Sequence, residues 1–522
     1  MFHLRSTNTA SGATAVQVVR YSNRKTIVHA HIGSTHDLKE IDSLKQAARQ
    51  WIEEHNQQTT LFPSKEKENT SVLVLEKSQY LGVRYSFIYE VLSTVFHFFD
   101  FHRLSNQLLL DLVLMRIIYP VSKRASLEYL SEMFGITYKE GSIYQAIPSF
   151  PKLKTTIEKK TVTVAKKHFA FDFSIVFYDV TTLYFESFTQ DEDMTDEKGN
   201  IVAKGFRKNG FSKDNKANQP QIVIGLIVTR EGFPVSYDVF AGNTFEGKTF
   251  IPTITKFKDT YAIKNLTVVA DAAMISFENV EKLKERQLSY IVGARVANLK
   301  LDQIEKISTE LIGQKTDILE LQKVDGTATR IETERGLLIC DFSLKRYRKD
   351  KREMEKQITK AEKLLEKKEG LKRTKFLMNK DKKKTEQIIN TDLVKKTKLL
   401  LGVKGYYTNL TEEANKTIID HYHNLWHVEQ AFRISKSDLA MRPIYHFKKQ
   451  TIEAHILICF MALAVCKYME LKTGKSTKKI VKLLKSITEA RILNKLTGKE
   501  IIMRQELPEE VSQLWKTLST SH

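Results

Sequence analysis

Cysteine, proline and long apolar runs are all scarce in this 522-residue chain. Its 3 cysteines, Cys340, Cys459 and Cys466, form no C-x-x-C pair, which excludes a disulfide scaffold and a cysteine-rich zinc module. With 9 prolines and 21 glycines it is neither collagen-like nor of low complexity. The longest apolar run, 456–466, has 11 residues, whereas a membrane-spanning helix needs about 20. The first residues contain no apolar stretch of the secretory kind, so we expect a soluble protein of a reducing cytoplasm, without a membrane partner.

The sequence does have a high apolar content and a large positive charge. Hydrophobic residues make up 42% and aromatic residues 10% of it, which excludes a disordered chain. The formal net charge is +21, and residues 345–398 contribute 21 basic against 9 acidic residues. This segment is either a solvated, salt-bridged helical hairpin or a basic arm that binds phosphates. The overall charge favours a polyanionic partner, of which nucleic acid is the commonest.

Both ends of the chain differ in pattern from its middle. Two strand candidates, 13–21 and 25–32, are joined by a polar turn and followed by a helix at 37–55. Segment 64–70 has the composition of a linker, and 85–170 is apolar with helical periodicity. From residue 420 onward we expect helices almost to the end of the chain.

The middle of the chain alternates strands and helices. The predicted order is strand, strand, strand, helix, strand, helix, strand, which fits a mixed sheet that opens with antiparallel hairpins and closes with βαβ crossovers. The length suggests about three structural units. We divide the chain into an N-terminal β-hairpin and helix at 1–70, a helical, candidate DNA-binding region at 71–170, a catalytic core at 171–296, an insertion with a basic arm at 297–405, the second part of the core at 406–460, and a C-terminal helical region at 461–522.

Three acidic residues occupy positions where chemistry is expected. Asp179 lies in the first strand of the predicted sheet, Asp271 directly follows the strand 266–270, and Glu429 lies on a helix. A carboxylate at a strand end of an α/β sheet points into the crevice where such folds bind ligands. Each one alone is as consistent with a helix cap. Because they are 92 and 158 residues apart, only a folded sheet brings them together.

The helix around Glu429 presents several functional side chains on one face. At 100° per residue, a sector roughly 80° wide contains Tyr422, Trp426, Glu429, Arg433 and Lys436. This face is either an ordinary surface with an i,i+4 ion pair, worth about 0.3–0.5 kcal/mol, or a metal-binding carboxylate flanked by cations that bind phosphate.

These residues carry a resemblance to a known family. Tyr422-x2-Leu425-x3-Glu429-x6-Lys436 resembles the Y-x2-R-x3-E-x6-K signature of the DDE transposases of bacterial insertion sequences. The resemblance covers roughly residues 170–460, in order. It extends to YDVTTLYFES around Asp179, GFSKDNKANQPQIVIGL at 210–226, GNTFEGKTF at 242–250 and ADAAMISFENVEKL at 270–283. One position departs from the signature, because Leu425 stands where the family has arginine.

The resemblance implies a fold and a set of site residues. The fold is α/β, a ribonuclease-H-like mixed sheet flanked by helices, with an insertion between the second Asp and the Glu and with helical N- and C-terminal regions. Asp179, Asp271 and Glu429 are then the catalytic residues and the ligands of Mg²⁺, for which Mn²⁺ substitutes; hard carboxylate oxygens suit this ion. Tyr422 and Lys436 would position the DNA backbone, and Arg433, one turn beyond Glu429, is the candidate for the missing arginine contact.

The implied activity is that of a DNA transposase. Such an enzyme binds the terminal inverted repeats of its element, cleaves there, and transfers the 3′ ends to target DNA by two-metal phosphoryl transfer. Its partner is double-stranded DNA, it acts as a homodimer in the synaptic complex, and it resides in the bacterial cytoplasm, on the nucleoid when bound to DNA. The alternative from another class is a catalytically inactive DNA-binding relative or regulator. All three carboxylates and Lys436 are present, which favours activity.

Two further motifs are weighed and set aside. Residues 242–249 match the P-loop pattern G-x4-G-K-[ST], but they follow the second arm of a hairpin, and Glu246 would face the nucleotide phosphates. His423 and His427 have the i,i+4 spacing of zinc ligands, without an H-E-x-x-H motif or a nearby cysteine. An NTPase and a zinc site are therefore the weaker interpretations.

Overall fold

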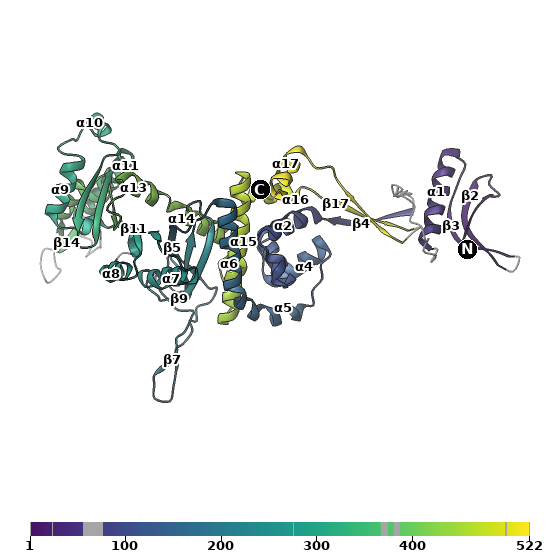
Figure 1. Ribbon diagram of the computed structural model, residues 1–522, viewed down its shortest axis with the longest axis horizontal. Helices are drawn as coiled ribbons and strands as arrows, with labels where there is room; N and C mark the ends of the chain where they lie inside the picture. Colours follow the sequence, from purple (N-terminus) through teal and green to yellow (C-terminus); the bar gives the residue numbers. More distant parts are fainter. Residues whose placement is uncertain are drawn as a thin grey trace. The chain divides into compact units, whose positions relative to one another are not determined.

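The chain divides into two compact units. Figure 1 labels the helices and strands of both. The computed structural model describes residues 2–22, 25–55, 77–274, 276–366, 374–379, 387–495 and 498–520. The predicted linker at 64–70, part of the turn at 22–24 and two stretches of the basic segment lie outside these residues. The first unit comprises Met1–Val91, Glu128–Thr137 and Lys482–Gln513, and the second comprises Leu92–Leu127, Tyr138–Val481 and Leu514–His522.

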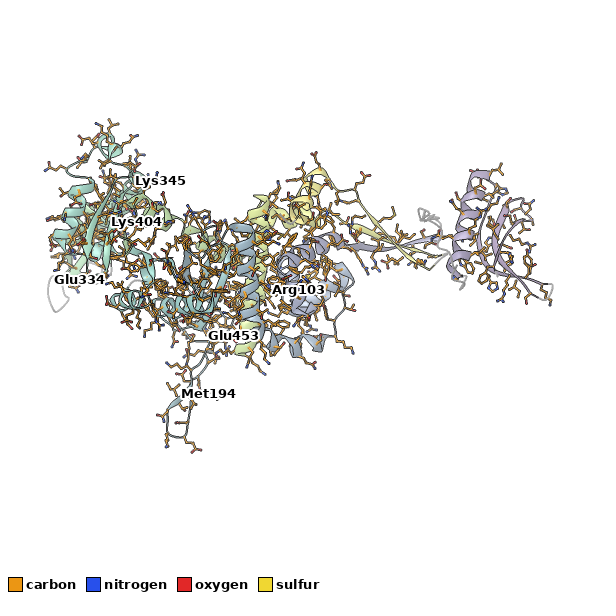
Figure 2. All side chains as sticks on the ribbon, viewed as in Figure 1. Arg103, Met194, Glu334, Lys345, Lys404 and Glu453 are labelled. Carbon is orange, nitrogen blue, oxygen red and sulfur yellow. The ribbon has the colours of Figure 1, made fainter. Side chains whose placement is uncertain are left out.

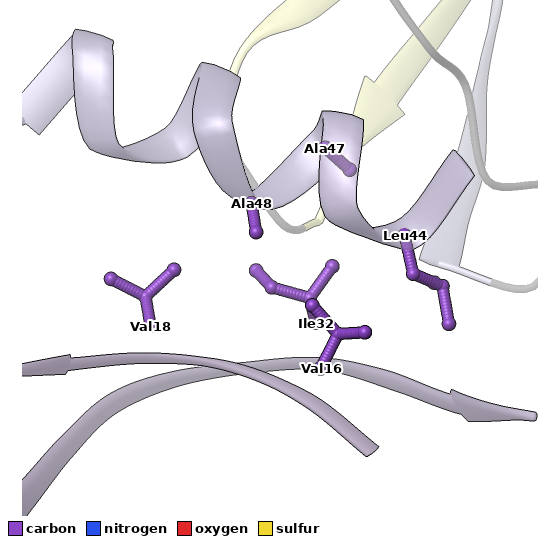
Figure 3. Packing of buried hydrophobic residues seen from close by; sticks show 6 residues of the cluster. All are labelled: Val16, Val18, Ile32, Leu44, Ala47 and Ala48. Carbon is purple, nitrogen blue, oxygen red and sulfur yellow. The ribbon is translucent and has the colours of Figure 1, made fainter. Parts of the chain in front are cut away.

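The N-terminal part of the first unit is a three-stranded antiparallel sheet covered by a helix. Its elements are β1 (His3–Asn8), β2 (Thr14–Ser22), β3 (Lys25–Thr35) and α1 (Leu38–His55). Val16, Val18 and Ile32 of the sheet pack against the Leu44 and Ala48 face of α1 (Figure 3). The two predicted strands and the helix are confirmed. β1 was not predicted because its sequence, HLRSTN, lacks the apolar alternation of a half-buried strand.

The same unit contains a second sheet that joins distant parts of the chain. Its strands are β4 (Ser78–Arg84), β17 (Glu489–Asn494) and β18 (Glu500–Arg504), all antiparallel, in the order β18-β17-β4. Arg491 pairs with Glu500 across the hairpin, and Arg504 pairs with Glu489. This hairpin interrupts the helices that we expected from residue 420 to the end. Local periodicity does not predict it, because β17 is completed by a strand about 400 residues earlier in the chain.

The second unit is built on a mixed sheet of eight strands in the order β12-β13-β16-β11-β10-β5-β8-β9. The strands are β5 (Ile175–Tyr184), β8 (Gln221–Val228), β9 (Pro234–Ala241), β10 (Thr267–Ala270), β11 (Ser289–Ala294), β12 (Ala328–Thr333), β13 (Gly336–Phe342) and β16 (Val403–Thr408). β5, β8 and β9 are antiparallel neighbours, whereas β10 and β11 run parallel to β5. With the crossovers α7 (Glu246–Thr260) and α8 (Phe277–Glu285), this is the predicted order of elements and confirms the mixed α/β fold.

Helices and a small ribbon surround this sheet. α15 (Lys449–Thr473) is long and apolar enough to cross a membrane, but 94% of its most apolar window is buried inside the protein, as expected of a core helix. It packs against α3 (Gln107–Ile118) and β9. Between β5 and β8 an unpredicted ribbon, β6 (Met194–Thr195) and β7 (Ile201–Ala203), projects from the unit and leaves Met194 67% exposed (Figure 2).

The insertion between β11 and β16 contributes strands and helices of its own. β12 and β13 extend the main sheet, because β13 pairs with β16. The remaining elements are α9 (Leu301–Leu311), α10 (Ile318–Lys323), α11 (Leu344–Glu366), β14 (Leu377–Asn379), β15 (Gln387–Ile389) and α12 (Thr391–Leu399). Met354 and Ala361 of α11 form a small core with Phe376 and Leu401. The described part of the basic segment is therefore a packed helical structure, with its charges on the outer face.

A lysine and two histidines cluster in the second unit. Lys123 Nζ lies 2.6 Å from His446 Nε2 and 3.1 Å from His455 Nδ1. His455 Nε2 lies 3.0 Å from the carbonyl oxygen of Met441. Burial, and next the charge of Arg116, lower the pKa of Lys123 to about 7, and burial lowers the pKa of His446 to about 3. Lys123 therefore donates to two neutral histidines.

The stability of this unit should depend on the charge of Lys123. Its pKa is lower in the folded than in the unfolded chain, so between pH 7 and pH 10.5 the unfolded chain binds more protons and the free energy of unfolding rises with pH. We expect the free energy of unfolding of wild type, relative to that of Lys123→Met, to increase by up to about 1.4 kcal/mol per pH unit in this range. Urea unfolding at pH 7 to 10 measures it. Lys152→Met, at an exposed position, is the control and should run parallel to wild type; a flat Lys123→Met difference would contradict the prediction.

Candidate active site

Strand pairing places two of the three acidic residues beside each other. β5 and β10 are parallel, and their register pairs Tyr178 with Ala270. Asp179 is the next residue on β5, and Asp271 directly follows the end of β10; neighbouring strands lie about 4.8 Å apart. Side chains in register on parallel strands point to the same face of a sheet. The two carboxyl groups, 92 residues apart in sequence, are therefore neighbours on one face.

The environment of Asp179 is unfavourable for a bare negative charge. Its side chain is half-buried, and Oδ1 accepts a 2.7 Å hydrogen bond from the backbone N–H of Val180. Burial raises the pKa of Asp179 to about 6, and the charges of Asp271 and Glu246 add to this rise, whereas the ammonium group of Lys213 opposes it. Folding thus holds a carboxylate where a further cation would be stabilising.

Tyr422 connects Asp271 to the signature segment. Its hydroxyl donates to Asp271 Oδ1 at 3.3 Å. Burial, followed by the charges of Asp271, Glu429 and Asp179, raises the pKa of this phenol well above its usual value. The buried phenol therefore feels all three carboxylates. Asp271 itself is exposed and also accepts a hydrogen bond from the N–H of Ala272 at 2.7 Å.

The signature segment is not one continuous helix. α13 (Asn415–His423) is capped by Asn424, and α14 (Trp426–Arg433) begins after Leu425. A π-helical turn, η6 (Ile434–Asp438), continues from the end of α14. The face calculated at 100° per residue is therefore wrong across 424–425 and beyond 433. Glu429 is exposed on α14 and makes no hydrogen bond or ion pair within the described part of the chain.

The two predicted cations of this segment lie in different surroundings. Lys436 is half-buried, and its Nζ lies 3.6 Å from Asp214 Oδ2, where Arg442 also pairs. Burial lowers the pKa of Lys436, and Asp214 opposes the shift. Arg433 is exposed at the end of α14 and forms no ion pair among the described residues. The structure thus ties Lys436 to the loop 210–219, and does not bring Arg433 into contact with the carboxylates.

Comparison with known proteins decides the family. The model of the transposase DDE domain matches residues 170–465, which is more than half of the chain. The chain belongs to the DDE transposase family. Among curated proteins, none matches this sequence. One similar solved structure is the piggyBac transposase in a synaptic complex with hairpin DNA, at 11% identity over 76% of this chain and 70% of that chain; its TM-score of 0.33 is too low to support an argument.

Two charged residues of the transposase site were not predicted. Lys213 Nζ donates to the carbonyl oxygen of Val180 at 2.7 Å and lies 2.9 Å from Glu246 Oε1. Lys213 belongs to the stretch 210–226 that carries the family resemblance; its side chain is 34% exposed, and its charge acts on Asp179. Glu246 belongs to the P-loop-like stretch, which follows β9, an antiparallel edge strand. The NTPase interpretation is therefore inconsistent with the sheet, and no local signal links Glu246 to Asp179.

The carboxylates of this transposase supply the right donor atoms for a divalent cation, but not a closed ligand set. Within the described residues no three His, Cys, Asp or Glu side chains lie close enough together to hold one metal ion. This holds for the three predicted carboxylates and for the histidines at 421–427. Asp179 and Asp271 offer hard oxygens on one face. Glu429 is exposed and has no partner among the described residues. Its side chain would have to change rotamer to complete a ligand set with Asp179 and Asp271.

The hydroxyl of Tyr422 fits against a glycine. A Cβ atom added at Gly293 would lie 2.5 Å from Tyr422 Oη and 3.0 Å from the nitrogen of Ala272. Gly293→Ala should therefore push the phenol away from Asp271 and slow DNA cleavage about 10- to 100-fold, because small displacements at a reacting centre are costly. A cleavage assay on DNA that carries the element's end measures this.

A double mutant separates this effect from general damage. If the loss comes through the displaced hydroxyl, Gly293→Ala should cost much less in a Tyr422→Phe background, where the oxygen is missing. Full additivity of the two substitutions would contradict the prediction. Thermal unfolding of each variant checks that the sheet is intact.

Proposed function

We propose that this chain is an active DNA transposase of an insertion sequence, which binds the terminal inverted repeats, cleaves at the transposon ends and transfers the 3′ ends to target DNA. The observation that carries the proposal is the proximity of Asp179 and Asp271, which directly follow the paired residues Tyr178 and Ala270, with Tyr422 hydrogen-bonded to Asp271. Membership in the DDE transposase family supports the reaction class. The net charge of +21 supports a DNA partner.

Each predicted residue has a chemical role in this proposal. Asp179, Asp271 and Glu429 would hold Mg²⁺ or Mn²⁺, which activates the attacking oxygen and stabilises the leaving one when bound. Tyr422 holds the Asp271 carboxylate in place through its hydrogen bond. Lys436 and Arg433 would bind backbone phosphates near the cleavage point. To bind a phosphate, Lys436 must give up its ion pair with Asp214, which would then pair with Arg442 alone, or bind the phosphate while it keeps that pair.

The proposed assembly is a homodimer that holds two transposon ends. Cleavage of a DNA fragment that carries the terminal repeats of the element tests the activity directly. Nicking at the repeat boundary that requires Mg²⁺ or Mn²⁺ and stops with chelator would support it. Repeat-specific binding without cleavage under any metal condition would instead identify a catalytically inactive, regulatory relative.

The exposed face of α11 should set part of the salt dependence of DNA binding. Arg352, Lys356 and Lys360 recur at i, i+4 and i+8 on this helix and are exposed. If they contact phosphates, replacing all three with glutamine should reduce the slope of log Kd against log salt by up to about 2.7, or 0.9 for each phosphate contact. Fluorescence anisotropy over a range of KCl concentrations gives this slope.

The matched control keeps the charge and changes the side chains. A variant with Arg352→Lys, Lys356→Arg and Lys360→Arg should keep the slope of wild type, since counterion release depends on charge. Identical slopes for the glutamine variant and wild type would show that α11 is a solvated helix without a role in DNA binding.

A further inference from the structure

Among the described residues, no cation of the signature segment contacts the carboxylates in place of the missing arginine. Leu425, at that position, is 6% exposed and packs into the core at the start of α14. Arg433, the residue one turn beyond Glu429, is exposed and makes no contact with the carboxylates among the described residues. A cation beside the carboxylates has to come from another element.

Lys404 on β16 is such a cation. β16 is antiparallel to β11, with Gly405 opposite Ala294, so Lys404 lies one residue beyond the segment paired with β11 and opposite Asp341 of β13. Figure 2 labels its side chain. Its Nζ is 4.5 Å from the ring centroid of Tyr422, the residue that donates to Asp271. Lys404 forms no ion pair within the described part of the chain.

The electrostatic surroundings of Lys404 agree with this position. Burial, and then the guanidinium of Arg346, lower its pKa, whereas the carboxylates of Asp341, Asp271 and Glu429 oppose that shift. Two of the three predicted metal ligands therefore act on this ammonium group, although neither pairs with it. Lys404 stands opposite Asp341 of β13 without forming an ion pair among the described residues, so its ammonium group has donors left for an incoming phosphate.

Lys404 also lines a cavity. A cavity of about 500 Å³ is lined by the end of β11, α11, α12 and the start of β16. Its cations are Arg295, Arg346, Lys375, Lys396 and Lys404. They outnumber its acids, Asp350 and Glu353, and Asp350 is already paired with Arg346 at 3.3 Å. Apolar side chains such as Met354 and Leu400 line the rest of the cavity.

We propose that Lys404 binds the DNA phosphate next to the carboxylates, in place of the missing signature arginine, and that the cavity behind it takes the adjoining phosphates of the same strand. This rests on the proposed function, because it names how the substrate of that site is held. Lysine acts here as a point charge and does not need the planar geometry of a guanidinium. The competing explanation is structural: Lys404 would only pack its charge over the ring of Tyr422.

Binding measured without divalent cations tests the proposal independently of cleavage. We expect Lys404→Gln to weaken binding of end DNA about 5- to 10-fold and to lower the salt slope by about 1, and Lys404→Arg to restore both. A series of DNA fragments then carries one neutral methylphosphonate each, at successive positions around the cleavage point. At one of these positions wild type and Lys404→Gln should bind the DNA with equal affinity, because the phosphate charge that Lys404 contacts is missing. An equal deficit at every position would overturn the proposal in favour of the packing role.

Two neighbouring lysines of α12 provide the control for the cavity. Lys396 lines it, whereas Lys395 pairs with Glu305 outside it at 2.9 Å. Lys396→Gln should weaken binding about 3-fold and Lys395→Gln should not; equal effects would remove the cavity from the proposal. If wild type binds end DNA but does not cleave it, the proposed function fails. The affinities of wild type, Lys404→Gln and Lys404→Arg for that DNA still show whether Lys404 binds a phosphate. Thermal unfolding of Lys404→Gln and Lys404→Arg verifies that both fold.

Discussion

Asp271→Asn should abolish DNA cleavage, with a loss of about 1,000-fold or more, while DNA binding and folding persist. The substitution keeps the size of the side chain and an oxygen that accepts from Tyr422 and Ala272. It removes the negative charge, and with it the affinity of the position for a divalent cation. It also relieves the repulsion of Asp179, whose pKa Asp271 helps to raise.

Three measurements on the same preparation are needed for Asp271→Asn. Cleavage of end DNA in Mg²⁺ gives the rate, anisotropy gives the affinity, and thermal unfolding gives the stability. Glu278→Gln is the matched control, since Glu278 is an exposed carboxylate in the first turn of α8 whose ion-pair partner is Lys282. Undiminished cleavage by Asp271→Asn would refute the site assignment, and so would an equal loss in Glu278→Gln.

Gly242→Ala is expected to cause the largest loss of stability among single methyl additions near the site. A Cβ atom there would lie 2.0 Å from the carbonyl oxygen of Gln221 and 2.3 Å from that of Lys208. Both contacts are backbone atoms of the sheet edge, which have no rotamer to yield, so the strands must move apart. We expect about 3 kcal/mol of destabilisation, at the upper end of the range for overpacking.

The loss should reach the active site as well. Gly242 precedes the start of α7, where Glu246 pairs with Lys213 beside Asp179. Gly141→Ala is the control for the chemistry of the substitution: Gly141 lies in α5 (Glu140–Ala146) with no heavy atom within 4 Å of an added Cβ. There alanine should raise the free energy of unfolding by about 0.5–1 kcal/mol. Urea unfolding measures the free energy of unfolding of both variants. Similar changes from wild type in Gly242→Ala and Gly141→Ala would contradict the prediction.

Some residues of the site stay predictions after the structure is known. Asp179, Asp271 and Tyr422 are neighbours by register and by hydrogen bond, but their catalytic roles depend on the assays above. Arg433 has no contact that supports a role. The signature arginine was sought on the same helix because a sequence motif shows only neighbours along the chain, whereas Lys404 lies on a strand whose place beside β11 is set by sheet pairing.

The amino-acid sequence alone determined the order of strands and helices from β5 to β11 and the positions of the acidic residues, because alternation and helical periodicity are properties of a few consecutive residues. Only the tertiary structure decided which charges meet: Lys213 and Glu246 beside Asp179, Lys404 over Tyr422, and the break of the signature helix before Trp426. It also decided the pairing of β17 with β4. The physical reason is that strand pairing and helix packing bring together residues that share no local pattern, and the energy of those contacts exists only once the sheet is formed.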